Sequence, residues 1–167
     1  MLVQSPPPSK REGFRPAGQV VSASRVLMTR RGGASLPRYK KGLRYEKKAL
    51  DFLEKQLSAL GTFIREPCFR FFDGIRTRFC YPDALLLLPN RCALLIEVKT
   101  RHTYDAWWQL CELYAPVVRK ALGLELRLLE VTAAFDPGVR LPQRRVLETV
   151  EEAIGHKGYG VFIWTGR

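Results

Sequence analysis

The chain has few of the residues on which several common kinds of site depend. Only two histidines occur among 167 residues, so a metal site built on histidine ligands is not expected. No glycine-rich phosphate loop of the GxxxxGK[ST] type occurs. No stretch reaches the roughly 18–20 apolar residues of a membrane span, and GGASLPRYKK follows Arg30-Arg31 where an export signal would be apolar. We therefore expect neither export nor a membrane partner.

Cysteine is also sparse, and its spacing argues against a metal centre. The four cysteines form no Cys-x-x-Cys pair, so zinc or iron–sulfur ligation has little support. Cys68, Cys80 and Cys92 fall in segments that the pattern predicts as strands, where a free cysteine behaves as a small hydrophobe. Free thiols indicate a reducing compartment, and we expect a cytoplasmic protein.

Positive charge, in contrast, is abundant and unevenly placed. The net charge is +12, and residues 1–41 hold nine Lys and Arg against one Glu. We expect a flexible basic arm over 1–41, with a short strand within QVVSASRVLM, ahead of an α/β domain over 42–167. A polyanion is the simplest partner for such charge, although the charge could instead only keep a disordered tail soluble. Candidate contacts in the arm are Arg30, Arg31, Lys40 and Lys41.

The hydrophobic pattern predicts a mixed α/β fold. Leucines recur at helical spacing from Arg44 to Leu60, and Glu46 shares their stripe. Glu46 there has either a functional role or the ordinary preference of an acid for the first turn of a helix. A two-residue turn is expected at Asp73-Gly74, and a helix break at Pro116. The predicted elements are a helix over 44–60, antiparallel strands over 62–72, 75–88 and 92–99, a helix over 104–122, a strand over 124–132, a helix over 144–154 and a strand over 158–165.

These elements predict a central mixed sheet of four to five strands flanked by helices, in the order αβββαβ followed by a C-terminal αβ. The strand after the crossover helix is expected to run parallel to the third one. The second and third strands, Ala84 to Leu88 and Cys92 to Ile96, are short apolar runs bounded by turn residues, which is typical of buried neighbours.

The register of this hairpin decides whether two acids meet. If Pro89 to Arg91 form a three-residue loop, Asp83 lies directly opposite Glu97 and Lys99 shares the face of Glu97. A two-residue turn would instead place Asp83 on the other face. Opposed like charges destabilise a sheet, and a divalent cation bound by both carboxylates would remove the repulsion. Oxygen ligands beside an ammonium suit Mg²⁺ or Mn²⁺ acting on phosphate.

Tyr81-Pro82-Asp83 and Glu97-Val98-Lys99, separated in this way, resemble the PD-(D/E)xK nuclease superfamily and its restriction-endonuclease-like fold. Glu46 matches the acid that many members carry on the first core helix, and the resemblance covers about residues 43–132. It implies metal-dependent phosphodiester hydrolysis. It further implies that Asp83 and Glu97 hold one or two Mg²⁺ ions, for which Mn²⁺ can substitute.

The same resemblance assigns supporting roles around these two acids. The backbone carbonyl of Val98 and the Glu46 side chain, directly or through water, would complete the metal site. Lys99 would orient the attacking water or stabilise charge in the transition state. Thr100, Arg101 and His102 follow the motif and could contact phosphate, although for His102 we favour a surface position at the entry to the helix.

Exonuclease-type members add a glutamine and a tyrosine on the next helix. Gln109 and Tyr114 are similar, but Tyr114 follows Gln109 by five positions here instead of four. Gln109 could point toward the carboxylates or toward water.

The sequence therefore predicts a Mg²⁺-dependent deoxyribonuclease, similar to small recombination or repair nucleases of phages and mobile elements. The alternative is a nucleic-acid-binding or structural protein that keeps the fold without hydrolysis. RNA as the substrate, cleavage within a strand or from its end, and a homodimer all stay open.

Overall fold

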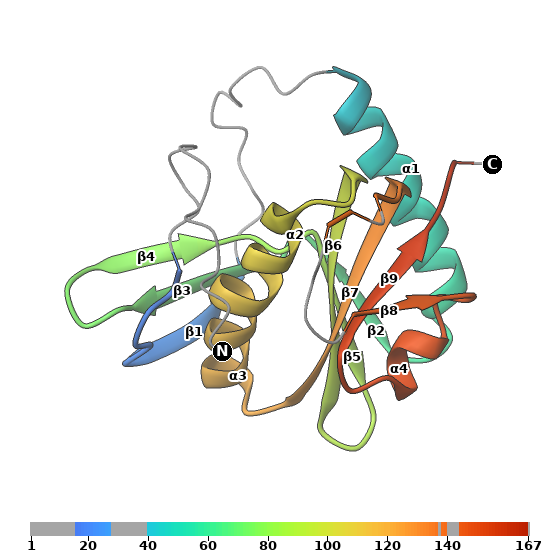
Figure 1. The fold of residues 1–167 in the computed structure, drawn as a ribbon. Helices are drawn as coiled ribbons and strands as arrows, with labels where there is room; N and C mark the ends of the chain where they lie inside the picture. The colour runs from blue at the N-terminus through green and yellow to red at the C-terminus, as the bar shows by residue number, and fades with distance from the viewer. Residues whose placement is uncertain (1–15, 28–39, 137, 140–143, 167) are drawn as a thin grey trace.

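The computed structural model describes residues 16–27, 40–136, 138–139 and 144–166, excluding the side chains of 40–43 (Figure 1). Two sheets and the helices that cover them make up this part of the chain. In chain order the elements are β1 (Ser22–Val26), α1 (Lys40–Leu57), β2 (Thr62–Arg65), β3 (Cys68–Phe72), β4 (Thr77–Cys80), β5 (Ala84–Leu88), β6 (Cys92–Arg101), α2 (Tyr104–Trp108), the π-helix η1 (Gln109–Tyr114), α3 (Ala115–Leu122), β7 (Glu125–Ala134), β8 (Arg144–Leu147), α4 (Glu152–Gly155) and β9 (Tyr159–Ile163).

The larger sheet has six strands in the order β2-β5-β6-β7-β9-β8. β5 is antiparallel to both of its neighbours, and every other pairing is parallel. The expected α/β architecture with a mixed, helix-flanked sheet is confirmed, as is the parallel pairing of β7 with β6. The sheet has more than the four to five strands that the sequence predicted.

Helices cover both faces of this sheet (Figure 1). On one face Leu50, Leu53 and Leu57 of α1 pack against even-numbered residues of β6 such as Leu94 and Ile96. On the other face α2, η1 and α3 pack against the odd-numbered residues of β6. Each buried leucine contributes about 1.5–3 kcal/mol. Among the described residues no helix has the length and apolarity to cross a membrane.

The long helical segment is interrupted ahead of Pro116, as predicted. A six-residue π-helix, η1, lies between α2 and α3, and Pro116 stands in the first turn of α3. Proline has no N–H to donate to the carbonyl four residues earlier. That carbonyl, of Glu112, instead accepts a 2.8 Å hydrogen bond from the N–H of Ala17. The interruption therefore provides an attachment point for the N-terminal segment.

The boundary predicted between a flexible arm and the domain is wrong for residues 16–27. Ala17 is buried in the core, and β1 pairs with β3 in antiparallel register. The short strand expected within QVVSASRVLM is confirmed. This part of the predicted arm belongs to the folded domain because its backbone completes a sheet.

The two long strands predicted over 62–72 and 75–88 are each divided in two. Pro67 separates β2 from β3, and Pro82 separates β4 from β5. Proline cannot donate to a strand ladder, so the hairpin breaks at both sites. Its outer half joins β1 in a separate sheet with the order β1-β3-β4.

The turn predicted at Asp73-Gly74 is longer than expected. Phe72 pairs with Thr77, so four residues form the loop. Asp73 Oδ1 accepts hydrogen bonds from the N–H groups of Ile75 and Arg76 at 2.9 and 2.8 Å. An aspartate that caps its own turn in this way stabilises the longer loop.

The helix predicted over 144–154 is also wrong. Arg144–Leu147 forms β8, parallel to β9, and only the single turn α4 is helical. Leu147 and Ala153 are buried against the α1 face of the sheet. Pairing with β9 thus overrides an apolar spacing that also fits a helix. The final strand, β9, is confirmed.

Candidate active site

The predicted hairpin register is confirmed. Leu88 lies opposite Cys92 and Ala84 opposite Ile96, so the same register places Asp83 opposite Glu97. The three-residue loop depends on left-handed backbone at Asn90 and Arg91, with φ angles of 61° and 56°. Both acids consequently belong to the sheet face that α2, η1 and α3 cover.

Backbone contacts fix Asp83 at the point where β5 begins. Its carbonyl accepts a 2.9 Å hydrogen bond from the N–H of Glu66. Its Oδ2 accepts a 2.7 Å hydrogen bond from the N–H of Val98, across the hairpin. This second bond holds the carboxylate beside the strand that carries Glu97, because Val98 and Glu97 are consecutive.

The Glu97 carboxylate has one oxygen that accepts a hydrogen bond from Lys99 and one oxygen that does not. The residue is 2% exposed, and its Oε1 accepts a 2.6 Å hydrogen bond from Lys99 Nζ. Its Oε2 is buried and has no hydrogen-bond partner among the described residues. A buried polar atom without a partner costs about 1–3 kcal/mol. In a native fold such an atom requires an explanation, and a catalytic role or a bound ion is one of them.

The pKa of the Glu97 carboxyl depends on the groups that surround it. Burial raises the pKa of its carboxyl, and the nearby Lys99 ammonium opposes that rise. The charge of Glu46 raises the pKa further, while a side-chain hydrogen bond with Asp83 lowers it. The other three residues predicted as catalytic therefore all lie within interacting range of Glu97.

Glu46 lies in the second turn of α1, since the helix begins at Lys40. Its charge acts on Glu97 although α1 packs against the opposite face of the sheet. Its side chain is half-buried. The preference of acids for helix starts weakens beyond the first turn, so the helix dipole explains this glutamate less well than the sequence suggested.

The donor set fits a small, hard cation. Within the described residues no three His, Cys, Asp or Glu side chains converge on a preformed metal site. Mg²⁺ commonly needs only one or two protein carboxylates, because it keeps several waters and binds substrate phosphate. Asp83 and the unpartnered oxygen of Glu97 satisfy that requirement.

Gln109 and Tyr114 lie together despite their unusual separation in sequence. They are the first and last residues of η1, and Gln109 Nε2 donates a 3.4 Å hydrogen bond to the Tyr114 hydroxyl. A π-helix brings residues five apart into register. Both side chains are buried, so Gln109 does not face water, and its Oε1 has no partner among the described residues.

The other predicted contact residues are less informative. Arg101 is exposed at the end of β6. Lys40 and Lys41 open α1, but their side chains lie outside the described part of the chain, as do Arg30 and Arg31.

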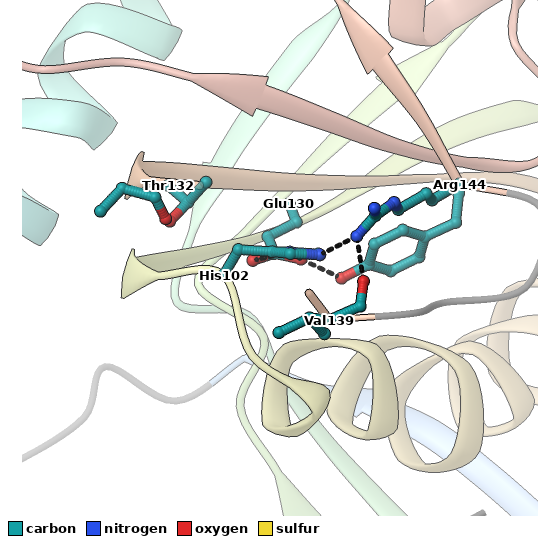
Figure 2. Close-up of polar contacts among 7 residues, drawn as sticks. His102, Glu130, Thr132, Val139 and Arg144 are labelled. Carbon is teal, nitrogen blue, oxygen red and sulfur yellow. Dashed lines mark hydrogen bonds and ion pairs between the residues drawn. The ribbon is translucent and has the colours of Figure 1, made fainter. Parts of the chain in front are cut away.

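The surface position predicted for His102 is wrong. His102 is 1% exposed, and its Nδ1 lies 3.0 and 2.9 Å from the two carboxylate oxygens of Glu130. Figure 2 shows His102 between Glu130 and Arg144, whose Nη1 is 3.0 Å from His102 Nε2. An arginine can only donate, so Nε2 accepts and Nδ1 donates to Glu130. The Tyr159 hydroxyl also donates a 2.5 Å hydrogen bond to Glu130.

This buried cluster of His102, Glu130, Arg144 and Tyr159 was not predicted. One signal was present: Glu130 interrupts the apolar run LRLLEVT, and a buried acid requires partners. The sequence could not show which residues would supply them.

Comparisons with known proteins add no family assignment. No family model matches the chain, and no curated protein or solved structure matches it either.

Proposed function

We propose that this protein is a divalent-metal-dependent nuclease that hydrolyses phosphodiester bonds in DNA. One observation carries the proposal: the buried, unpartnered Oε2 of Glu97 lies in a site that also holds Asp83, Glu46 and Lys99. A fold that only bound nucleic acid would gain nothing from this uncompensated acid. The order of α1, the hairpin β5–β6, the crossover helices and parallel β7 also resembles the restriction-endonuclease-like core.

Asp83 and Glu97 would hold the metal, Mg²⁺ or Mn²⁺, with the Val98 carbonyl and Glu46 as further oxygen donors. When bound, the ion would make a water more acidic and offset negative charge on the phosphate. The 2.7 Å bond from Val98 N–H to Asp83 fixes the orientation of one donor before any ligand arrives. Such preorganisation lowers the cost of reaching the transition state.

Lys99 would place the nucleophile or stabilise the phosphate. Its side chain is 26% exposed while its Nζ contacts the buried Glu97. It therefore spans the distance between the buried acid and the surface where a substrate would lie. An ammonium held in that position can orient a water or neutralise charge that develops on the phosphate.

The test is a panel of linear, circular, single-stranded, flapped and four-way-junction DNA, and a matched RNA, incubated with Mg²⁺ or Mn²⁺. We expect cleavage of at least one substrate, and its loss in each of Asp83→Ala, Glu97→Ala and Lys99→Ala. Glu148→Ala, at an exposed glutamate, is the control and should cleave normally. Cleavage that survives in all three site variants would refute the proposal, as would a wild type that cleaves nothing.

The basic N-terminal residues offer a second test. Because β1 belongs to the domain, the useful truncation removes residues 1–15 alone, which include Lys10, Arg11 and Arg15. We expect weaker DNA binding and a shallower salt dependence, by roughly 0.9 in log–log slope for each phosphate that is no longer neutralised. An unchanged slope would show that these residues do not contact DNA.

A further inference from the structure

The smaller sheet carries a concentration of exposed apolar side chains. Eight large hydrophobic side chains are exposed among the described residues, and five of them belong to this sheet or its ends. These five are Val21, Leu27, Ile75, Phe79 and Tyr81. In Figure 1 the β3–β4 hairpin of this sheet projects away from the six-stranded sheet.

Strand register defines the outer face of this sheet. Ser24, Arg70 and Phe79 lie side by side across the three strands in one row. The next row consists of Ser22, Phe72 and Thr77. The opposite, inner face carries Phe69 and Phe71, which are buried in the core. An open groove of about 310 Å³ crosses the outer face, lined by Ser22, Ala23, Ser24, Arg70, Phe71, Phe72 and Thr77.

The chemistry of the outer face favours a single-stranded nucleic acid. Phe79 is 52% exposed and directly opposite Arg70, so an aromatic face and a cation are adjacent. Arg70 is exposed. Aromatic rings that stack on bases, beside cations that meet phosphates, are how proteins bind single strands. In a duplex the base faces are already stacked on one another and inaccessible to Phe79.

The charge of the region agrees with a polyanion. The only acid in the β3–β4 loop is Asp73, whose carboxylate is engaged by two backbone N–H groups and by Arg78. Arg76 in the same loop is exposed. An acidic protein partner would satisfy these charges but would leave the exposed ring of Phe79 without a planar group to stack on.

We propose that the outer face of β1, β3 and β4 binds single-stranded nucleic acid, with a base stacked on Phe79 and a phosphate paired with Arg70. The bound strand then continues past Tyr81 to the proposed nuclease site at Asp83. Asp83 follows Phe79 by four positions, so their Cα atoms are at most about 14 Å apart, a distance that a few nucleotides can bridge. This second step rests on the proposed function and implies a substrate with a single-stranded segment.

The test measures binding by the full chain in EDTA, so that no cleavage is required. The probes are a labelled single-stranded DNA of about 12 nucleotides and a duplex of the same sequence, read by fluorescence anisotropy. We expect Phe79→Ala to weaken single-strand binding by roughly 5- to 100-fold, as loss of one stacked base does, and to leave duplex binding unchanged. Arg70→Gln should weaken binding and lower the salt slope by about one.

Matched variants separate stacking from general apolar contact. Phe79→Tyr keeps an aromatic face and should bind as the wild type does, whereas Phe79→Leu keeps apolar bulk and should bind as weakly as Phe79→Ala. Ile75→Ala removes an even more exposed apolar side chain, 89% exposed, and should have no effect. Circular dichroism of each variant confirms that it is folded.

Three results would overturn the inference. One is wild-type single-strand affinity in Phe79→Ala, and another is an equal loss for single strand and duplex. The third is a concentration-dependent dimer that only Phe79→Ala abolishes, which would make this face an interface between copies of the chain. A failure of the nuclease proposal would give a different result. The wild type and Glu97→Gln would both bind the single strand, but the wild type would cleave no substrate with any metal.

Discussion

Glu97 and Glu130 are neighbours in register on two parallel strands and share one face of the sheet. Both are almost completely inaccessible to solvent, at 2% and 0% exposure. Glu130 receives hydrogen bonds on both oxygens, from His102 and Tyr159. Glu97 accepts a hydrogen bond from Lys99 on one oxygen, while its Oε2 is buried and meets no N–H donor among the described residues; the neighbouring polar group is the Asp83 carboxyl. Burial alone therefore does not distinguish the two acids, whereas their hydrogen bonds do.

The two acids have opposite effects on the stability of the folded protein. Glu130 connects β6, β7 and β9 through His102 and Tyr159, and Arg144 extends the connection to β8. A fully bonded polar cluster of this kind makes one packing arrangement unique. Glu97 instead keeps a desolvated oxygen whose cost a bound cation would offset. Four predictions follow from this contrast, in order of decreasing effect.

The largest effect is expected on catalysis. Glu97→Gln should lower kcat/KM for DNA cleavage by about 10⁴-fold or more, the usual loss for an essential catalytic group. Glu130→Gln should lower it less than about 10-fold, because Glu130 contacts no atom of the proposed reaction. Initial rates with Mg²⁺ on the best substrate of the panel provide the measurement. Equal losses in the two variants would erase the distinction between the acids.

For folding stability in the absence of metal, substitution of Glu130 should have a larger effect than substitution of Glu97. Glu130→Ala leaves His102 and Tyr159 buried without their partner, and it should destabilise the protein by about 3–5 kcal/mol. Glu97→Ala removes an acid that is already unsatisfied and frees a lysine that can reach water, so it should change stability by less than about 1 kcal/mol. Urea unfolding in EDTA measures both. A Glu97→Ala variant as unstable as Glu130→Ala would mean that Glu97 is structural.

Sequence reasoning found one of these acids and missed the other, for a physical reason. Asp83 and Glu97 lie on strands joined by a three-residue loop, so loop parity alone fixes their register. Glu130 meets His102 and Tyr159 only after a crossover and the insertion of β9 beside β7. Such long-range pairing leaves no local periodicity in the sequence.

The errors in the fold have the same origin. The breaks at Pro67 and Pro82 were visible as prolines, but their effect depended on β1 arriving to build a second sheet. The helix predicted over 144–154 fitted its apolar spacing, yet β9 required a partner strand. Where a neighbour close in sequence decided the structure, as in the β5–β6 hairpin, the prediction held, except that Asp73 closes a four-residue loop where a two-residue turn was expected.

The third prediction concerns stabilisation by a bound metal, where the expected difference between the Glu97 and Glu130 variants is smaller than in folding stability. Ca²⁺ at about 100 times its dissociation constant should stabilise the wild type by about 2.7 kcal/mol, or roughly 5–10 °C in Tm. Glu97→Gln and Asp83→Ala should lose this shift. Glu130→Gln, although less stable, should retain it. Differential scanning fluorimetry across a Ca²⁺ series gives the comparison, and a full shift in Glu97→Gln would remove this acid from the metal site.

The smallest effect concerns the phenol that donates to Glu130. Burial, followed by the charge and hydrogen bond of Glu130, raises the pKa of Tyr159 well above its ordinary value of 10.0. An acid with a raised pKa in the folded state keeps its proton after the unfolded chain has lost its own. Its stabilising contribution is therefore complete below about pH 10 and is lost as the pH rises toward the folded value.

Replacing Glu130 tests that linkage directly. Glu130→Gln removes the negative charge but not the burial, so the pKa of Tyr159 should fall while staying above 10.0. Because the chain has six tyrosines, tyrosinate absorbance must be compared with that of the same protein carrying Tyr159→Phe, and the difference assigned to this residue. Glu97→Gln, at an acid that does not bond to Tyr159, should shift the titration less. If both variants moved it equally, the bond to Glu130 would not be what holds the Tyr159 proton.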